Sequence, residues 1–216
     1  MSKIRITPDI DDVLYLSSKG FWSVGNREWG VTDPYNDDWI KWLSPDPVVC
    51  RARRNTIWTE GHTLGFSIMP HAHEVLGRLV THGLYGHEVE IVAATSRPDI
   101  ARDATEEAIG RDFGGIITDI AYAGFFDGPY DPAAMNLDKG SFFKALGSHG
   151  AIDDIPRHVE GAELNGIPEV IHFTAVHPPV KGLHKRIRQA NCWLAVERIL
   201  TSSQAIPQLL GGVNGS

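Results

Sequence analysis

Apolar and polar positions along the chain follow two alternating patterns. Short apolar runs predict buried strands, and apolar residues three and four positions apart predict helices, as at Val75, Leu76 and Leu79, where a glycine then closes the segment. The predicted strands are residues 3–6, 88–97, 116–123, 151–154 and, as the last one, 169–175, and the predicted helices are 69–83, 97–115, 138–150 and 155–166. This alternation predicts an α/β three-layer sandwich around a central parallel, Rossmann-like sheet.

Residues 15–68 interrupt the alternation. They hold five of the six tryptophans and several turns rich in Pro and Asp. We therefore predict a core formed by residues 1–14 and 69–203, a small aromatic-rich cap inserted at 15–68, and a flexible tail at 204–216. Most of the rings are expected to form a mini-core, and one or two to stack on a flat substrate group such as a nucleobase. The five tryptophans are Trp22, Trp29, Trp39, Trp42 and Trp58.

Composition narrows the class of protein. The 216 residues are 42% hydrophobic and 22% charged, as in ordinary soluble globular proteins. The net charge of -7 argues against a general nucleic-acid binder, although basic clusters occur at 51–54 and 181–188. Cys50 and Cys192 lie far apart without a CxxC spacing, which favours a reducing, cytoplasmic compartment. We expect no membrane association, because there is no leader and no apolar run of the ~18 to 20 residues that cross a bilayer.

Carboxylates follow two of the predicted strands. Asp9, Asp11 and Asp12 come directly after the first strand, and Asp153 and Asp154 end a later one. In open α/β sheets, ligands bind at the carboxyl ends of the strands. A divalent cation with a preference for hard oxygen ligands would offset the mutual repulsion of these groups. The two clusters therefore predict a Mg²⁺ site, whereas Asp12 is expected mainly to cap a helix or turn.

Donors for a phosphoryl group follow two other segments. Thr95 and Ser96 end the strand at 88–97, and Lys139 precedes a glycine at the start of a helix. Lys144 is the rival for the lysine position. Arg97 either shapes a phosphate loop or is a solvated charge at a helix start. The ten histidines lack the spacing of a zinc site and are expected at the surface or at helix caps.

These segments, in this order, resemble the motifs of the haloacid dehalogenase-like (HAD) hydrolase superfamily. "DIDDVL" is similar to its DxDx(T/V)(L/V) signature, "ATSR" to its second motif, "DKG" to its third and "AIDD" to its fourth. Further segments, "HEVLGRLVTHG" and "IDDIPRHVEGAELNGIP", resemble the branch that contains 5'-nucleotidases and 5'(3')-deoxyribonucleotidases. Pro8 departs from the pattern and predicts an interrupted hydrogen-bond ladder just before Asp9.

The resemblance implies a role for each site residue. Asp9 would attack phosphorus and become a transient aspartyl phosphate, and Asp11 would act as general acid and then as general base. Thr95, Ser96, Arg97 and Lys139 would bind the phosphoryl group, with Thr95 and Lys139 also catalytic. The Mg²⁺ ligands implied are Asp9, Asp11 through its backbone carbonyl, and one of Asp153 and Asp154. Because the second aspartate is not needed to cleave carbon–halogen bonds, its presence favours phosphoryl transfer.

Three functions are compatible with this reading. The first is a Mg²⁺-dependent phosphomonoesterase for a small phosphorylated metabolite, best a (deoxy)nucleoside 5'-monophosphate. The second is a polynucleotide end-processing phosphatase, the one alternative with a nucleic-acid partner, which could use both basic clusters. The third is a non-catalytic relative that binds a phosphorylated ligand or a protein, which the complete set of motif residues disfavours. A homodimer is compatible with the sequence.

Overall fold

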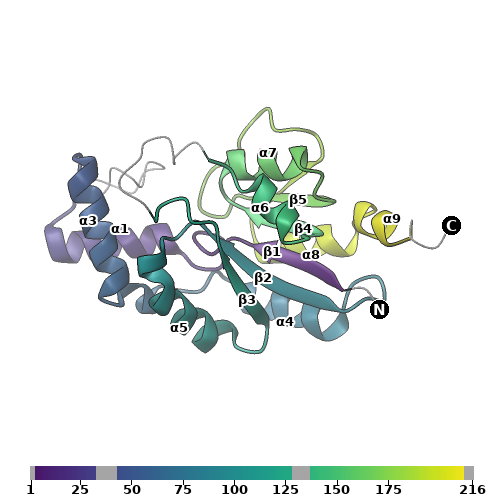
Figure 1. Cartoon of the computed structure of the whole chain (residues 1–216), viewed down its shortest axis with the longest axis horizontal. Coiled ribbons are helices and arrows are strands. Elements are labelled where there is room, and N and C mark those ends of the chain that lie inside the picture. Colours follow the sequence, from purple (N-terminus) through teal and green to yellow (C-terminus); the bar gives the residue numbers. More distant parts are fainter. Residues whose placement is uncertain (1–2, 33–42, 128–136, 212–216) are drawn as a thin grey trace.

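A parallel sheet forms the centre of the protein. The structure is a computed structural model that describes residues 3–32, 43–127 and 137–211. Its six strands lie in the order β3-β2-β1-β4-β5-β6, and every neighbouring pair is parallel. Strands β1, β2 and β3 lie side by side in Figure 1. The strands are β1 (Ile4–Pro8), β2 (Val89–Thr95), β3 (Ile117–Tyr122), β4 (Gly150–Asp153), β5 (Glu169–Phe173) and β6 (Ile187–Ala190). The α/β sandwich predicted from the sequence is confirmed.

Helices cover both faces of this sheet. One hydrophobic core joins the strands to α4 (Ala72–His82), α5 (Arg102–Phe113) and α8 (Trp193–Thr201). A second, smaller core joins them to α6 (Gly140–Ala145) and α7 (Pro156–Leu164). A short 3-10 helix, η2 (Asp99–Ala101), leads into α5. Buried side chains on both faces explain why the strands carry nearly continuous apolar runs instead of alternating ones.

The C-terminal third differs from the prediction in two places. The strand at 169–175 is not the last, because β6 and α8 follow it. β6 escapes detection since its two central residues, Arg188 and Gln189, are exposed and only its ends are buried. Within the expected tail, residues Ala205–Gly211 form helix α9, and Ile206 is fully buried.

Pro8 interrupts the sheet as predicted. The ladder between β1 and β2 stops after Ile6 pairs with Ile91, and contact resumes at a single bridge between Asp9 and Ala94. On the other side β1 stays paired with β4, where the Asp9 N–H donates to the Ile152 carbonyl at 2.8 Å. Proline lacks the N–H that a continuous ladder needs, so the pairing of β1 with β2 is broken directly before Asp9.

The inserted segment 15–68 contains α1 (Ser17–Trp29), α3 (Pro47–Thr59) and the 3-10 helix η1 (His62–Gly65), and α1 and α3 lie beyond one end of the sheet (Figure 1). We refer to residues 15–68 as the cap segment. The chain leaves and returns side by side: the Leu16 N–H donates to Ser67 O at 2.9 Å, and the Met69 N–H donates to Leu14 O at 2.8 Å.

The cap segment buries an aromatic cluster that is continuous with the main hydrophobic core. Phe21 meets Trp58 edge-on at 5.9 Å and Phe66 at 5.2 Å between ring centroids, and all three side chains are buried. Trp29 lies under the guanidinium of Arg53. Trp58 is thus buried as expected, but within the main hydrophobic core and not in a separate mini-core, whereas Trp39 and Trp42 lie outside the described residues.

Candidate active site

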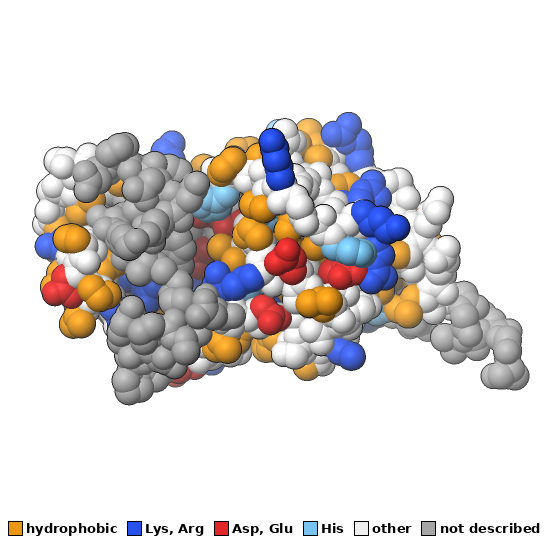
Figure 2. All heavy atoms as spheres, turned by 90° about the horizontal axis from the view of Figure 1, so that it is seen from above, with side chains coloured by type: hydrophobic (Ala, Val, Ile, Leu, Met, Phe, Trp, Pro, Cys, Tyr) orange, Lys and Arg blue, Asp and Glu red, His pale blue; other side chains and the backbone are white. Residues whose placement is uncertain are grey.

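The carboxyl ends of β1, β2 and β4 are neighbours in the sheet, and they bring the predicted site residues together. Lys139 lies at the centre. Its Nζ atom is 2.6 Å from Asp9 Oδ1 and 3.0 Å from Asp153 Oδ2, and its side chain is 1% exposed. Viewed from above, acidic and histidine side chains are visible in the recess between the cap segment and the sheet (Figure 2).

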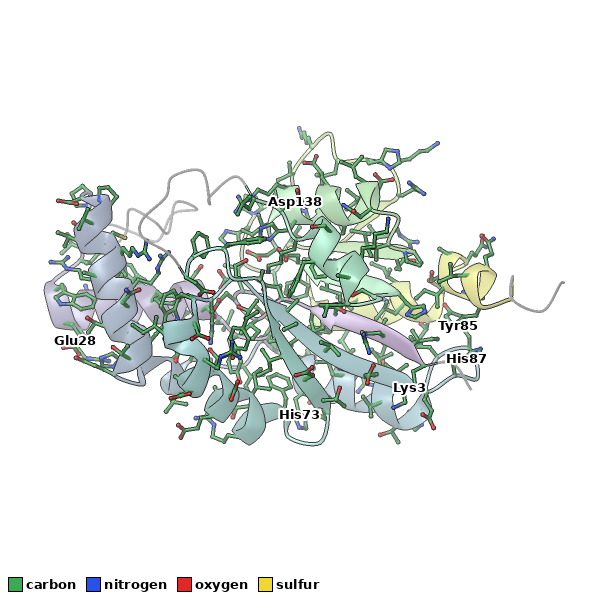
Figure 3. The ribbon with its side chains drawn as sticks, viewed as in Figure 1. Lys3, Glu28, His73, Tyr85, His87 and Asp138 are labelled. Carbon is green, nitrogen blue, oxygen red and sulfur yellow. The ribbon has the colours of Figure 1, made fainter. Side chains whose placement is uncertain are left out.

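Two glycines place Lys139 at this point. A Cβ atom on Gly140 would collide with the backbone carbonyl of Gly161 in α7, and one on Gly161 would collide with Asp138. Because glycine has no Cβ atom, α6 can begin directly against α7. At this point the Gly140 N–H donates to Asp138 Oδ1 at 2.7 Å (Asp138 is labelled in Figure 3). Lys144, the rival for the lysine position, is exposed on α6, so Lys139 occupies the site.

Asp153 is held by donors on every side. Its Oδ1 accepts from the Ile155 N–H at 2.9 Å, and His158 Nδ1 lies 3.1 Å from the same oxygen. Burial by itself would raise the pKa of Asp153, but Lys139, His158 and the Ile155 N–H outweigh it and hold the pKa far below its ordinary value. Asp153 therefore stays ionised and fixed in position.

Asp154 has a different environment although it is the next residue. Its carboxylate lies 3.4 Å from His177 Nε2, and its backbone carbonyl is 3.0 Å from His172 Nε2. Burial, followed by the negative charges of Asp153, Asp12 and Asp9, raises the pKa of Asp154 well above its ordinary value. The Asp154 carboxylate therefore has oxygen lone pairs available to bind a cation, and the positive charge around it is too small to offset the neighbouring carboxylates.

The nucleophile candidate, Asp9, is 5% exposed. Burial raises the pKa of Asp9 to about 7, although Lys139 acts in the opposite direction. Carboxylate oxygens of Asp9, Asp153 and Asp154 lie close enough together to ligate a single ion. Three buried carboxylates around one ammonium leave a surplus of negative charge, and hard oxygen donors are the ligands that Mg²⁺ prefers. The donor set fits a divalent cation.

Asp11 forms a fork-shaped ion pair with Arg97. Arg97 Nε donates to Asp11 Oδ2 at 3.0 Å and Nη2 donates to Oδ1 at 2.7 Å, while Nη1 donates to Thr105 at 3.0 Å. Burial would raise the pKa of Asp11, but Arg97 outweighs it and lowers the pKa below its ordinary value. Arg97 is 3% exposed, so its interpretation as a solvated charge is wrong.

The two hydroxyls after β2 keep donor capacity. Thr95 is buried, and its Oγ1 accepts from the Arg97 N–H at 3.0 Å, which leaves the hydroxyl proton free to donate. Ser96 Oγ is a buried atom with no hydrogen-bond partner among the described residues. A buried hydroxyl without a hydrogen bond costs free energy, so a ligand oxygen that accepts from it would remove this cost.

Asp12 caps α1 and also borders the site. Its Oδ1 accepts from the Ser18 N–H at 2.9 Å, its Oδ2 is hydrogen-bonded to Ser18 Oγ, and its backbone has a positive φ of 57°. The capping role expected for Asp12 is confirmed. Asp12, Asp154 and His177 also form a second group of close ligand atoms.

Sequence reasoning missed the histidines of this region. His158 and His172 are buried, His177 is 13% exposed at its side chain, and each contacts Asp153 or Asp154. The expectation that the histidines lie at the surface or at caps is therefore wrong for these three. Only the proximity of His158 to the acidic pair, five residues after Asp153, could have drawn attention to it.

Neither a protein-family model nor a curated protein matches the sequence. A predicted phosphatase from Clostridium acetobutylicum has the same fold, with a TM-score of 0.62 and 14% identity over 92% of this chain and 98% of that chain. YfnB from Bacillus subtilis, assigned as a HAD hydrolase and bound to magnesium, has a TM-score of 0.58 and 11% identity over 93% and 99% of the two chains. CbbY from Rhodobacter sphaeroides, in complex with xylulose bisphosphate, has a TM-score of 0.56 and 12% identity over 89% and 95%.

Dehalogenases share the fold as well. At identities this low, the likeness shows a shared Rossmann-like fold and leaves the reaction open. Resemblance to the 5'-nucleotidase branch remains a prediction. None of the helices in the described ranges is long and apolar enough to cross a membrane.

Proposed function

We propose that the protein is a Mg²⁺-dependent phosphomonoesterase that works through an aspartyl phosphate. The observation that carries the proposal is the position of Lys139, which bridges Asp9 and Asp153 at the carboxyl edge of the sheet. A lysine ammonium has three protons, and two of them face these carboxylates, so the third can neutralise a phosphoryl oxygen. The hydroxyls of Thr95 and Ser96 supply further donors for such oxygens.

The chemistry follows from the two aspartates. An oxygen of the Asp9 carboxylate attacks phosphorus, the bond from phosphorus to the leaving oxygen breaks, and Asp11 gives a proton to that oxygen. Asp11 then takes a proton from a water molecule, whose oxygen attacks phosphorus and releases inorganic phosphate and the free Asp9. Lys139, Thr95 and Ser96 hold the three phosphoryl oxygens in both steps.

Asp9 and Asp154, with the backbone carbonyl of Asp11, would hold the metal. We favour Asp154 over Asp153 as the direct ligand, because the oxygens of Asp153 already accept from Lys139, Ile155 and His158. When bound, Mg²⁺ supplies positive charge that favours the ionised form of Asp9 and withdraws electron density from the phosphoryl group.

Arg97 would control the availability of Asp11. An acid must carry a proton, yet the ion pair with Arg97 favours the ionised form of Asp11. A phosphate ester brings an anion that competes for the same guanidinium, and Arg binds phosphate through the same fork of donors. In this proposal, substrate binding draws Arg97 away from Asp11 and allows Asp11 to take up its proton.

For the substrate we propose a (deoxy)nucleoside 5'-monophosphate, with the cap segment providing the selectivity. Trp22 follows Ser18 by four residues on α1 and so lies on the same stripe of the helix as the residue that contacts Asp12. On α3, Arg51 donates to Phe126 O at 3.3 Å and the Arg54 guanidinium lies 5.5 Å from the Phe126 ring, on a loop that follows β3. An aromatic ring and two guanidinium groups of the cap segment would suit a flat anionic substrate.

The polynucleotide alternative has less support. Arg53, within the 51–54 cluster, donates to Leu43 O inside the cap segment, and Arg186, within the 181–188 cluster, pairs with Glu163 on α7. In each cluster, at least one arginine therefore contacts a neighbouring part of the protein, which leaves fewer cations for a nucleic-acid backbone. We also propose a reducing, cytoplasmic compartment, on the spacing of Cys50 and Cys192 in the sequence.

A substrate screen tests the proposal. The purified protein would be assayed with mononucleotides, sugar phosphates, a 3'-phosphorylated oligonucleotide and a 2-haloacid, each with Mg²⁺ or with EDTA. We expect phosphate release from mononucleotides that EDTA abolishes. Halide release would identify a dehalogenase, and activity on the oligonucleotide that falls steeply with salt would favour the polynucleotide alternative. A folded chain inactive on every phosphate ester would contradict the proposal.

A further inference from the structure

His177 lies between two buried carboxylates at the border of the site. It belongs to the segment that follows β5, at the same carboxyl edge of the sheet as Asp9 and Asp154. Its Nε2 atom is 3.3 Å from Asp12 Oδ2 and 3.4 Å from Asp154 Oδ2. The side chains of Asp12 and Asp154 are each 6% exposed, so water does little to separate their charges.

The four buried carboxylates of the site divide into two pairs, each with one nitrogen group between its members. Lys139 lies between Asp9 and Asp153, and His177 lies between Asp12 and Asp154. The first nitrogen belongs to the motif residues. The second nitrogen, that of His177, is not part of any motif. It lies between two buried carboxylates, Asp12 and Asp154, whose like charges repel each other strongly in a site with little water.

Asp12 is anchored independently of the site. The N–H and hydroxyl of Ser18 both donate to its carboxylate, and Ser18 lies in the first turn of α1. A carboxylate fixed in this way can fix the imidazole next to it. Among the described residues, no such anchor holds the carboxylate of Asp154, the other neighbour of that imidazole, whereas Asp153 has three donors.

We propose that His177 is a positioning residue that holds the Asp154 carboxylate in the orientation needed to bind a divalent cation, through the chain of contacts Ser18, Asp12, His177 and Asp154. The inference rests on the proposed function only in taking Asp154 as a direct metal ligand. Residues that orient a metal ligand typically affect metal affinity by about tenfold to hundredfold when they are removed. His172 differs, since it contacts the backbone carbonyl of Asp154 and not the carboxylate.

The test measures Mn²⁺ binding to the full chain without substrate, from the electron paramagnetic resonance signal of free Mn²⁺. The variants are His177→Ala, which removes the ring, and His177→Gln, which keeps a side-chain N–H. His184→Gln is the matched control, because His184 lies in the same segment but pairs with Glu163, away from the site. We expect one Mn²⁺ per chain in all proteins and a dissociation constant raised at least about tenfold in His177→Ala. His177→Gln should fall between wild type and His177→Ala, and His184→Gln should bind like wild type.

A double variant tests the chain of contacts. If Asp12 acts through His177, Asp12→Asn should weaken Mn²⁺ binding, and the Asp12→Asn, His177→Gln pair should be no weaker than the worse of the two single variants. Additive losses would overturn the relay. Unchanged binding in folded His177→Ala and His177→Gln would overturn the role of His177, as would two Mn²⁺ ions in wild type and one in His177→Ala, which would make His177 a ligand. A wild-type chain that binds no Mn²⁺ would instead contradict the metal-dependent function itself.

Discussion

Arg97 and Asp11 are joined by two parallel hydrogen bonds of 2.7 and 3.0 Å, and the arginine side chain is 2% exposed whereas the aspartate side chain is 32% exposed. The residue proposed as general acid is thus tied to a buried guanidinium in the free protein. The same guanidinium also donates to Thr105, which fixes its plane. The pair links the loop after β2 to the loop after β1, and Thr105 connects it to α5, so we expect it to contribute to stability as well as to catalysis.

Arg97→Met should lower the free energy of unfolding by about 3 kcal/mol, because it leaves a partly buried carboxylate without its partner. The double variant with Asp11→Asn should recover part of this loss, since the orphaned charge is then absent. Arg102→Met is the control: its ion pair with Asp99 is exposed, and its loss should cost less than about 1 kcal/mol. Urea unfolding measures all four proteins, and equal losses for Arg97→Met and Arg102→Met would contradict the buried pair.

The stability difference between wild type and Arg97→Met should depend on pH. Arg97 lowers the pKa of Asp11 in the folded protein below its ordinary value of 3.8. The contribution of the pair is therefore fully present above the unfolded pKa and disappears as the pH falls through the lower, folded pKa. Unfolding at a series of pH values should show a constant difference near neutrality that shrinks in acid below about pH 4. A difference independent of pH down to acid unfolding would exclude this coupling.

Asp9→Asn should reduce turnover by a factor of a thousand or more, on the order expected when a nucleophile is removed. The fold should survive, since burial raises the pKa of Asp9 to about 7 and an uncharged amide removes a group that is costly to ionise there. p-Nitrophenyl phosphate hydrolysis and the melting temperature check the two parts. A variant that hydrolyses the ester at nearly the wild-type rate would rule out the covalent mechanism.

Asp153 and Asp154 should respond differently to conversion to asparagine. Asp154→Asn should raise the Mg²⁺ concentration for half-maximal activity by about tenfold or more, as expected for a direct ligand. Asp153→Asn should mainly lower stability, because Lys139 and His158 lose the carboxylate they contact. Mg²⁺ titrations and urea unfolding of both variants separate the two effects. Identical titrations for wild type and both variants would sink the assignment of this acidic pair to the metal.

Trp22→Ala should weaken the preference of the enzyme among nucleotides and keep its rate on p-nitrophenyl phosphate within a fewfold of wild type. Trp22 is half-buried on the same α1 stripe as Ser18, which contacts Asp12, and the effect is expected if this ring stacks on the base. Trp29→Ala is the control, because Trp29 is covered by Arg53 within the cap segment. The kcat/KM values for a set of nucleotides measure the effect. Trp58→Ala should instead lower stability by about 3 to 5 kcal/mol.

If folded Trp22→Ala keeps the wild-type ranking of nucleotides, Trp22 does not select the base. The two remaining tryptophans of the cap segment, Trp39 and Trp42, would then be tested in the same way. A ranking that survives in all of these variants would contradict base stacking by the cap segment.

The sequence by itself determined the sheet and the meeting point of the motif residues. Strands at β1, β2 and β4 could be recognised because burial on both faces requires nearly continuous apolar runs, which are local in the sequence. Once those strands are parallel neighbours, their carboxyl ends share one edge, and Asp9, Thr95 and Asp153 must lie together there. The interruption of the ladder at Pro8 could also be predicted, because the missing N–H of proline breaks a hydrogen-bond ladder wherever it occurs.

Only the tertiary structure decided how the side chains pair. Arg97 and Asp11 are 86 positions apart, and His177 and Asp12 are 165 apart, so no local pattern relates the members of either pair. β6 could not be predicted from the sequence, because its central residues are exposed and polar and it is stabilised by pairing with β5. Lys139 and Lys144 are only five positions apart in the sequence, and the close approach of Gly140 to Gly161 is what places Lys139 in the site. Pairings of this kind depend on the register of the sheet and on how closely helices can approach, and these follow from the packing of the whole chain.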